Sequence, residues 1–306
     1  MKRFLSLFLC ALILLPVLAA CADNGPQTGA DTTAATVPET EAETAPETVP
    51  ETEAETEPPA PAVTELKAGA WNNSNTLKEA QKFSIPYQIY LPVGYTPEKN
   101  YPVLFYLHGN GSRGTNNTTQ ISNDSAEILK RIRVSADHKG DVIMIAPQCS
   151  TNTQWVSCDY KVGNYTSTPK MAACLQTAVE IFDYWTDLLS TDPDRYYLYG
   201  NSMGGFACWD LMSRFPDRFA AAVIVAGCGD LAKAPEMKDL AIWIHHGTTD
   251  TTVPYSGNEK MEKALREAGA GDNVILTPYP GKGHTIFKEV GASPAVLKWI
   301  FEQKKG

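Results

Sequence analysis

The stretch over residues 197–205, Tyr-Leu-Tyr-Gly-Asn-Ser-Met-Gly-Gly, constrains the fold more than any other part of this chain. The aromatic and apolar run that leads into it, residues 195–199, is typical of a buried strand. The apolar residues of 206–212 recur at the spacing of a helix. Between them, the pattern Gly200-x-Ser202-x-Gly204 predicts a sharp strand-to-helix turn with a strained serine at its tip, because the two elements pass so close that only small residues fit. The alternative is a glycine-rich turn with an ordinary serine.

The charge of the chain is concentrated near its N-terminus. The 306 residues carry a formal net charge of −9, and residues 22–66 hold eleven acidic and no basic side chains. Residues 67–306 are therefore electrically balanced, which gives no basis for nucleic-acid binding. The apolar content of 43 % suffices for one sizeable core in a domain of roughly 240 residues.

The first 62 residues predict an export signal followed by a linker. Lys2 and Arg3 precede an apolar run and two small residues, as in a signal peptide over residues 1–20. The sequence Leu18-Ala19-Ala20-Cys21 resembles the lipobox of bacterial lipoproteins, which implies acylation of Cys21 and a membrane anchor; a plain secretory signal is the alternative. Residues 21–62 repeat one acidic octapeptide at 37–44 and 49–56 and hold few large apolar side chains, so we expect a disordered linker rich in Thr, Pro and Glu.

Residues 63–306 predict one α/β domain with a mostly parallel central sheet and helices on both faces. An alternating pattern predicts a half-buried strand at residues 83–91. Apolar runs predict buried strands at residues 101–107, 142–146, 195–199, 221–226, 240–244 and 274–276. Helices are expected at residues 125–134, 171–189, 201–215, 258–268 and 294–301. Ligands bind such sheets beyond the carboxyl ends of the strands, where the motifs below are expected.

The serine at position 202 needs a general base, because a hydroxyl is a poor nucleophile near neutral pH. His284 is the best candidate of the five histidines, since it stands beside glycines in a loop after the last predicted strand. The other four are expected in structural or solvated positions: His108 and His246 at loop backbone, His245 in the core and His138 in solvent.

The base in turn needs a carboxylate that fixes its tautomer and stabilises its protonated form. Asp250 follows a buried strand and is the first choice, with Asp230 and Asp272 as alternatives and a turn or N-cap role as the structural interpretation. The chain order Ser202, Asp250, His284 is the order found in α/β-hydrolases.

A negatively charged intermediate would need backbone N–H donors, each worth roughly 3–4 kcal/mol. The amide of Met203 follows the serine at a helix N-terminus and is the first expected donor. The second is expected in the loop after residues 101–107, from Asn110, with Gly109 or Gly111 as alternatives.

These motifs together resemble an α/β-hydrolase. More narrowly, the chain is similar to secreted esterases of the dienelactone hydrolase, feruloyl/acetylxylan esterase and polyhydroxybutyrate depolymerase group, which includes proteins called "predicted peptidase". The matching segments are residues 107–114, 146–149, 192–195, 200–205 and 246–254, with His284. The resemblance implies a compact hydrolase with an open cleft, in which Trp155 forms a substrate wall or packs in the core. Dienelactone hydrolases use a cysteine nucleophile, which is replaced here by Ser202, so their substrate is not expected.

The cysteines show no metal or redox spacing, and no cofactor is implied. Beyond Cys10 and Cys21 there remain Cys149, Cys158, Cys174, Cys208 and Cys228, of which Cys149 and Cys158 are the local candidates for a disulfide. We therefore expect a lipid-anchored serine esterase outside the cytoplasm, acting on a small ester or on acetyl or feruloyl esters of plant polysaccharide. The alternatives are a serine peptidase of the same fold and a non-catalytic surface-binding lipoprotein.

Overall fold

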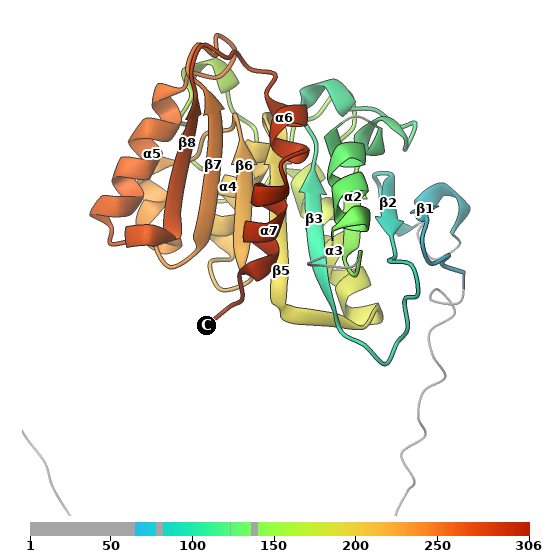
Figure 1. Cartoon of the computed structure of the whole chain (residues 1–306). Helices are drawn as coiled ribbons and strands as arrows, with labels where there is room; N and C mark the ends of the chain where they lie inside the picture. The colour runs from blue at the N-terminus through green and yellow to red at the C-terminus, as the bar shows by residue number, and fades with distance from the viewer. Residues whose placement is uncertain (1–64, 78–81, 123, 136–139) are drawn as a thin grey trace, which may run out of the picture. The chain divides into compact units, whose positions relative to one another are not determined.

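An eight-stranded sheet forms the centre of the domain in the computed structural model, which describes residues 65–77, 82–122, 124–135 and 140–306. Its strand order is β1-β2-β4-β3-β5-β6-β7-β8 (Figure 1). The six strands from β4 to β8 in this order pair in parallel, whereas β1 and β2 are antiparallel at one edge. The strands are β1 (Trp71–Asn73), β2 (Tyr87–Tyr90), β3 (Tyr101–Leu107), β4 (Ile143–Pro147), β5 (Thr191–Asn201), β6 (Ala221–Val225), β7 (Ala241–Gly247) and β8 (Val274–Tyr279). The predicted mostly parallel α/β sheet is confirmed.

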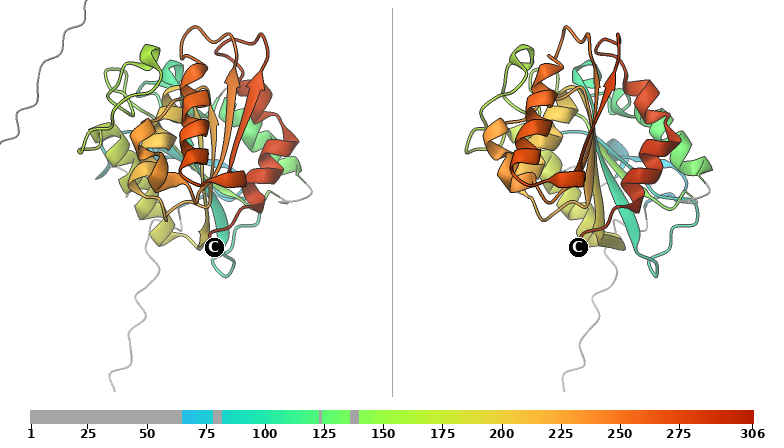
Figure 2. Two further views of the ribbon diagram at one scale, coloured as in Figure 1. Left: turned by 90° about the vertical axis from the view of Figure 1, so that its left-hand side faces the viewer. Right: turned by 60° about the vertical axis from the view of Figure 1, so that its left-hand side comes forward.

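Helices cover both faces of this sheet. Figure 2 shows α3, α4 and α5 on one face and α2, α6 and α7 on the other. The helices are α2 (Asp124–Val134), α3 (Ala173–Leu188), α4 (Met203–Arg214), α5 (Ser256–Glu267), α6 (Phe287–Gly291) and α7 (Pro294–Glu302). Short 3-10 helices lie in the connections: η1 (Ser74–Thr76), η3 (Asn110–Ser112), η4 (Thr119–Ile121), η5 (Tyr160–Val162), η6 (Leu231–Met237) and η7 (Gly271–Asn273).

Strand β3 is formed by a continuous apolar run because both of its faces are buried. Its side chains point alternately to the two faces of the sheet. Val103, Phe105 and Leu107 pack into the core beneath α3, α4 and α5, whereas Leu104 and Tyr106 pack beneath α2, α6 and α7. All five are at most 2 % exposed, so neither face of the strand tolerates a polar residue.

The observed elements depart from the sequence predictions mainly where they are short. The strand expected at residues 83–91 is limited to β2, which is buried on both faces and not half-buried as predicted. Strand β1, helix α6 and the 3-10 helices were not predicted. The missed elements are short and lack the continuous apolar runs that marked β3, β4 and β6 in the sequence. The predicted signal peptide, Cys21 and the linker over residues 21–62 lie outside the described residues. Among the residues that are described, no helix has the length and apolarity needed to cross a membrane.

Candidate active site

Ser202 lies at the tip of a tight turn between β5 and α4. Its backbone has φ 52° and ψ −117°, in the left-handed region that non-glycine residues seldom adopt. Its N–H donates to the carbonyl of Val225 at the end of β6, at 2.7 Å, which helps to hold the strained conformation. Ser202 is 9 % exposed, and it lines the cleft described below.

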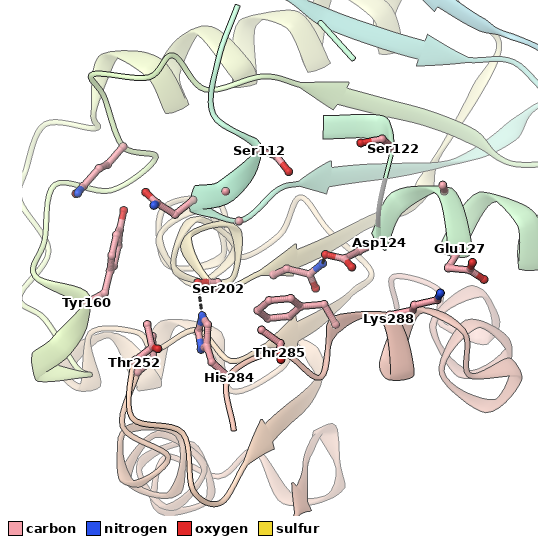
Figure 3. Close-up of a pocket in the computed structure, with 18 residues that line it drawn as sticks. Ser112, Ser122, Asp124, Glu127, Tyr160, Ser202, Thr252, His284, Thr285 and Lys288 are labelled. Carbon is pink, nitrogen blue, oxygen red and sulfur yellow. Dashed lines mark hydrogen bonds between the residues drawn. The ribbon is translucent and has the colours of Figure 1, made fainter. Parts of the chain in front are cut away.

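Three side chains from three separate loops are hydrogen-bonded in series. His284 Nε2 lies 2.8 Å from Ser202 Oγ (Figure 3). On the other side of the imidazole, His284 Nδ1 lies 2.7 Å from Asp250 Oδ2. Ser202 follows β5, Asp250 follows β7 and His284 follows β8, so each stands beyond the carboxyl end of its strand. The structure thus brings together the three side chains that the sequence singled out.

The Asp250 carboxylate is held by hydrogen bonds on both of its oxygens. Oδ1 accepts the backbone N–H groups of Thr252 and Val253 at 2.8 and 2.9 Å, and Oδ2 accepts from His284 and from His246. Burial by itself raises the pKa of this carboxyl, but the hydrogen bonds from His246, His284 and Val253 outweigh it and hold the pKa below its ordinary value. Asp250 is therefore ionised at neutral pH.

The loop that carries His284 is fixed against the loop that carries Asp250. The N–H and hydroxyl of Thr249 both donate to the carbonyl of Lys282, at 3.0 and 2.9 Å. Gly247 makes this approach possible, since a Cβ atom there would lie 2.2 Å from the carbonyl oxygen of Gly283. Gly247 thus lets the two backbones meet, and this contact sets the position of the imidazole.

The loop after β3 reaches Ser202 from the other side. A Cβ atom at Gly109 would lie 3.5 Å from Ser202 Cβ, so this backbone passes beside the serine. His108 is wholly buried beneath the loop: its Nδ1 lies 2.7 Å from the Gly109 carbonyl, and its Nε2 accepts the Cys149 N–H at 2.9 Å. A nitrogen that accepts leaves Nδ1 as the donor, so His108 is neutral, and burial lowers its pKa to about 4. The expectation that His108 holds loop backbone agrees with these contacts.

Trp155 does not form a wall of the cleft as proposed from the sequence. Its side chain is 0 % exposed, and its indole N–H donates to the carbonyl of His108 at 3.0 Å. The indole packs against the His108 ring with the centroids 5.2 Å apart. A buried tryptophan needs a partner for its N–H, and here the backbone that leads to Gly109 supplies it. Trp155 therefore supports the loop beside Ser202 from below.

The remaining histidines and the alternative carboxylates lie elsewhere. Asp230 accepts from Ser167 and caps η6, and Asp272 is exposed in η7. His245 is buried beside Tyr279, as expected for a packing residue, and His138 lies outside the described residues. His246 differs from its prediction, because its Nε2 contacts the carboxylate of Asp250 as well as the Val253 carbonyl, both at 3.0 Å. The four-residue spacing of His246 and Asp250 at the end of a strand is the sequence feature that could have predicted this contact.

An open cleft of about 960 Å³ surrounds the serine. Figure 3 shows Tyr160 and Thr252 on one side of Ser202, and Asp124, Glu127 and Lys288 on the other. Residues 109–112 line it as well, including Asn110, whereas Met203 is buried. The sequence did not single out the charged residues, since on α2 and α6 they look like any polar helix face.

No disulfide and no metal cluster occurs in the described part of the chain. Cys149, Cys158, Cys174, Cys208 and Cys228 are all free thiols, so the candidate pair of Cys149 and Cys158 is not formed. No group of three or more His, Cys, Asp or Glu side chains among these residues could hold a metal ion.

This fold, with a serine at a strand-to-helix turn that is hydrogen-bonded to a histidine and through it to an aspartate, defines the domain as an α/β-hydrolase. The family described as "Putative esterase" matches residues 79–300, and the chain belongs to this esterase family.

Known relatives agree with this assignment. The bifunctional acetylxylan esterase/xylanase XynS20E of Neocallimastix patriciarum is 26 % identical over 203 residues, which are 63 % of this chain and 25 % of that protein. The match thus spans about a quarter of the length of the curated relative. The crystal structure of a thermostable esterase is similar with a TM-score of 0.64 and 28 % identity, over 72 % of this chain and 59 % of the other. A ferulic acid esterase shares the fold, with a TM-score of 0.55 and 17 % identity over 76 % of this chain and 96 % of the other.

Proposed function

We propose that the domain hydrolyses carboxylic esters by way of an acyl-enzyme on Ser202. The observation that carries the proposal is the continuous series of hydrogen bonds from Ser202 Oγ to His284, at 2.8 Å, and from His284 to Asp250, at 2.7 Å. Hydrogen bonds of this length are within the reach that proton transfer requires. The ionised Asp250 holds the proton of neutral His284 on Nδ1, which leaves Nε2 free to accept the serine proton.

The reaction then proceeds in two halves. Ser202 Oγ attacks the ester carbonyl carbon while its proton passes to His284 Nε2, and the carbonyl oxygen becomes an oxyanion. His284 returns the proton to the oxygen of the leaving alcohol as the C–O bond breaks. Water, deprotonated by His284, attacks the acyl-enzyme, and the acid leaves as Ser202 regains its proton.

We propose that the N–H groups of Met203 and Asn110 stabilise the oxyanion. Met203 is the first residue of α4, so its N–H belongs to the positive end of a helix dipole. Asn110 begins η3 in the loop that passes beside Ser202. The bond between His108 Nδ1 and the Gly109 carbonyl fixes the peptide plane that contains the Asn110 N–H. Such pre-aimed donors need no reorganisation when charge develops.

The proposed substrates are acetyl or feruloyl esters on plant polysaccharide. Sequence similarity to a protein named as an acetylxylan esterase supports the acetyl group. An open cleft lined by Ser112, Ser122, Asp124 and Gln154 offers hydrogen-bond partners for sugar hydroxyls. The charged groups Asp124, Glu127 and Lys288 lie on one side of the serine and Tyr160 on the other, which leaves room for an apolar acyl group beside the tyrosine.

The experiment is turnover of p-nitrophenyl acetate and butyrate, acetylated xylan and feruloylated xylan, against an alanine anilide as the peptidase substrate. We expect ester cleavage without anilide cleavage and loss of turnover in Ser202→Ala. Ser213→Ala is the matched control, because Ser213 lies on α4 outside the cleft and its hydroxyl donates to the Asp210 carbonyl. Full activity of Ser202→Ala would refute the mechanism, and cleavage of the anilide alone would favour the peptidase.

We also propose that the protein acts outside the cytoplasm, anchored through lipid on Cys21. The support is the sequence Leu18-Ala19-Ala20-Cys21 after an apolar run, together with the acidic linker that follows. Mass spectrometry of the N-terminal peptide from detergent-extracted protein should find an acylated Cys21. Cys21→Ser should move the protein from the membrane fraction, and an unchanged distribution would contradict the anchor.

A further inference from the structure

We infer that His246 is a positioning residue for the proposed reaction, which sets the Asp250 carboxylate for His284 and is itself set by Asn258. The inference rests on the proposed function, because it assigns a role to a residue that acts through Asp250. His246 is buried at the end of β7, one turn of chain before Asp250, and has no contact with the cleft.

The Nε2 atom of His246 faces Asp250. Nε2 lies 3.0 Å from Asp250 Oδ2 and 3.0 Å from the Val253 carbonyl oxygen. Both neighbours are acceptors, so Nε2 must carry a hydrogen. The same Oδ2 accepts from His284 Nδ1 at 2.7 Å. One carboxylate oxygen is thus shared by two imidazoles, one buried and one facing the cleft.

The opposite ring nitrogen of His246, Nδ1, faces Asn258. His246 Nδ1 lies 2.8 Å from Asn258 Nδ2, in the first turns of α5. An amide N–H₂ can only donate, so Nδ1 is the acceptor and carries no hydrogen. His246 is therefore the neutral tautomer with its proton on Nε2, and Asn258 selects that tautomer.

This orientation of the Asn258 amide leaves its side-chain oxygen unsatisfied. Asn258 is 0 % exposed, and its Oδ1 has no hydrogen-bond partner in the described part of the chain. An unsatisfied buried acceptor is unfavourable, and turning the amide would place Oδ1 against Nδ1. That contact would require a protonated His246. The fold therefore holds an orphaned oxygen in the orientation that keeps His246 neutral.

These contacts fix the orientation of the Asp250 carboxylate, on which the proposed reaction depends. With its two oxygens held by His246 and by the N–H groups of Thr252 and Val253, Asp250 cannot rotate away from His284. A small displacement of a catalytic group costs about 10²-fold in rate. The ionisable groups that face this site are Asp250, His284 across the shared oxygen, Tyr255 with its ring 5.7 Å from that of His246, and Cys228, which interacts electrostatically with Asp250.

The test compares four variants of the full chain. His246→Leu removes the donor to Asp250, and His246→Gln places an amide N–H₂ near the position of Nε2. Asn258→Leu keeps the imidazole but no longer selects its tautomer. His245→Leu is the matched control, because His245 is an equally buried histidine on β7 that packs against Trp243 and Tyr279 and makes no contact with Asp250.

The readouts are kcat, KM and the pH profile with p-nitrophenyl acetate, the phosphonylation rate of Ser202 by a fluorophosphonate, and the folded fraction by circular dichroism. In His246→Leu we expect kcat to fall about 10- to 100-fold with KM little changed. The acid limb of its pH profile should move to lower pH, because a displaced Asp250 favours protonation of His284 less. His246→Gln should recover most of kcat, Asn258→Leu should fall in between, and His245→Leu should match the wild type.

The inference is overturned if folded His246→Leu keeps the wild-type kcat and acid limb, or if the Gln variant loses as much as the Leu variant. If His246→Leu does not fold, the other two variants decide. The inference is then overturned if folded Asn258→Leu keeps the wild-type kcat and acid limb, or if His246→Gln loses most of kcat. If the wild type cleaves no ester, the proposed function fails. The phosphonylation rates still report whether His246 controls the reactivity of Ser202.

Discussion

Gly204 lies directly against the carbonyl of Leu107, such that a Cβ atom at position 204 would stand 1.8 Å from that oxygen. The first turn of α4 is thereby pressed onto the end of β3. The contact brings the turn at Ser202 next to the loop of residues 109–112 and leaves no room for any other residue type.

Gly204→Ala should therefore prevent α4 from docking. Because the clash is with backbone, which cannot move aside like a side chain, we expect a loss of at least about 3 kcal/mol in the free energy of unfolding, with no activity in the folded remainder. Urea denaturation measures it. Gly111→Ala is the control, since no atom beyond its two chain neighbours lies within 4 Å of a Cβ there. Equal stability of the two variants would contradict the close approach.

Asp250→Asn should lower kcat by roughly 10³- to 10⁴-fold with little change in KM, because an amide at this position no longer selects the tautomer of His284 that accepts the serine proton. Steady-state kinetics on p-nitrophenyl acetate measures this. Asp230→Asn is the comparison: Asp230 caps η6 and bonds Ser167, so its loss should affect stability and spare kcat. A larger loss of kcat in the Asp230 variant would reverse the assignment.

Trp155→Phe should reduce stability by about 1–3 kcal/mol, because the buried His108 carbonyl loses the indole N–H that it accepts at 3.0 Å. We expect kcat to fall and KM to stay, since Trp155 lies beneath the loop and not in the cleft. Thermal denaturation and kinetics check both parts, with half-buried Trp299→Phe on α7 as control. A change in KM alone would restore the interpretation of Trp155 as a substrate wall.

Stability should decline as the pH falls from about 6.5 towards 4. Burial lowers the pKa of His108 to about 4 and that of His245 to about 3, from an ordinary value of 6.5. The unfolded chain therefore binds these protons before the folded protein does. Once the pH is below the folded pKa, the cost is on the order of 3 kcal/mol for His108 and 5 kcal/mol for His245. Asp250, whose pKa is lowered, stays ionised through this range.

Urea denaturation between pH 7.5 and 4.5 measures this decline in wild type and in His245→Phe. The variant should lose less stability, because one of the two histidines no longer titrates. The carboxyl of Asp124, whose pKa burial raises, has the opposite sign but is common to both proteins and cancels in the difference. Parallel curves for wild type and variant would show that His245 is not the group responsible.

The thiols of the described domain should remain reduced, including Cys149 and Cys158. Mass spectrometry after alkylation under denaturing, non-reducing conditions should find all five cysteines from Cys149 to Cys228 modified. Cys149→Ala combined with Cys158→Ala should leave the thermal midpoint unaffected by reductant, as in the wild type. Finding the two cysteines joined would instead support the pairing expected from their local spacing.

The sequence by itself determined the α/β class, the strands β2 to β8, the helices α2, α3, α4, α5 and α7, and the candidates Ser202, Asp250 and His284. The reason is that these features have local causes. Buried strands such as β3 require consecutive apolar residues on both faces, and the tight turn at Ser202 requires glycine on both sides. Each requirement can be read within a dozen residues of chain.

Only the tertiary structure decided which distant groups meet. Asn258 contacts His246 from the start of α5, and Trp155 reaches the His108 carbonyl across 47 residues of sequence, so neither role has a local pattern. The charged residues on one side of the cleft also come from distant parts of the sequence. Asp124 lies on α2 and Lys288 on α6, and the fold places these two helices together on one face of the sheet. Hydrogen-bond partners of this kind depend on three-dimensional distance, which residue type and spacing along a single sequence do not encode.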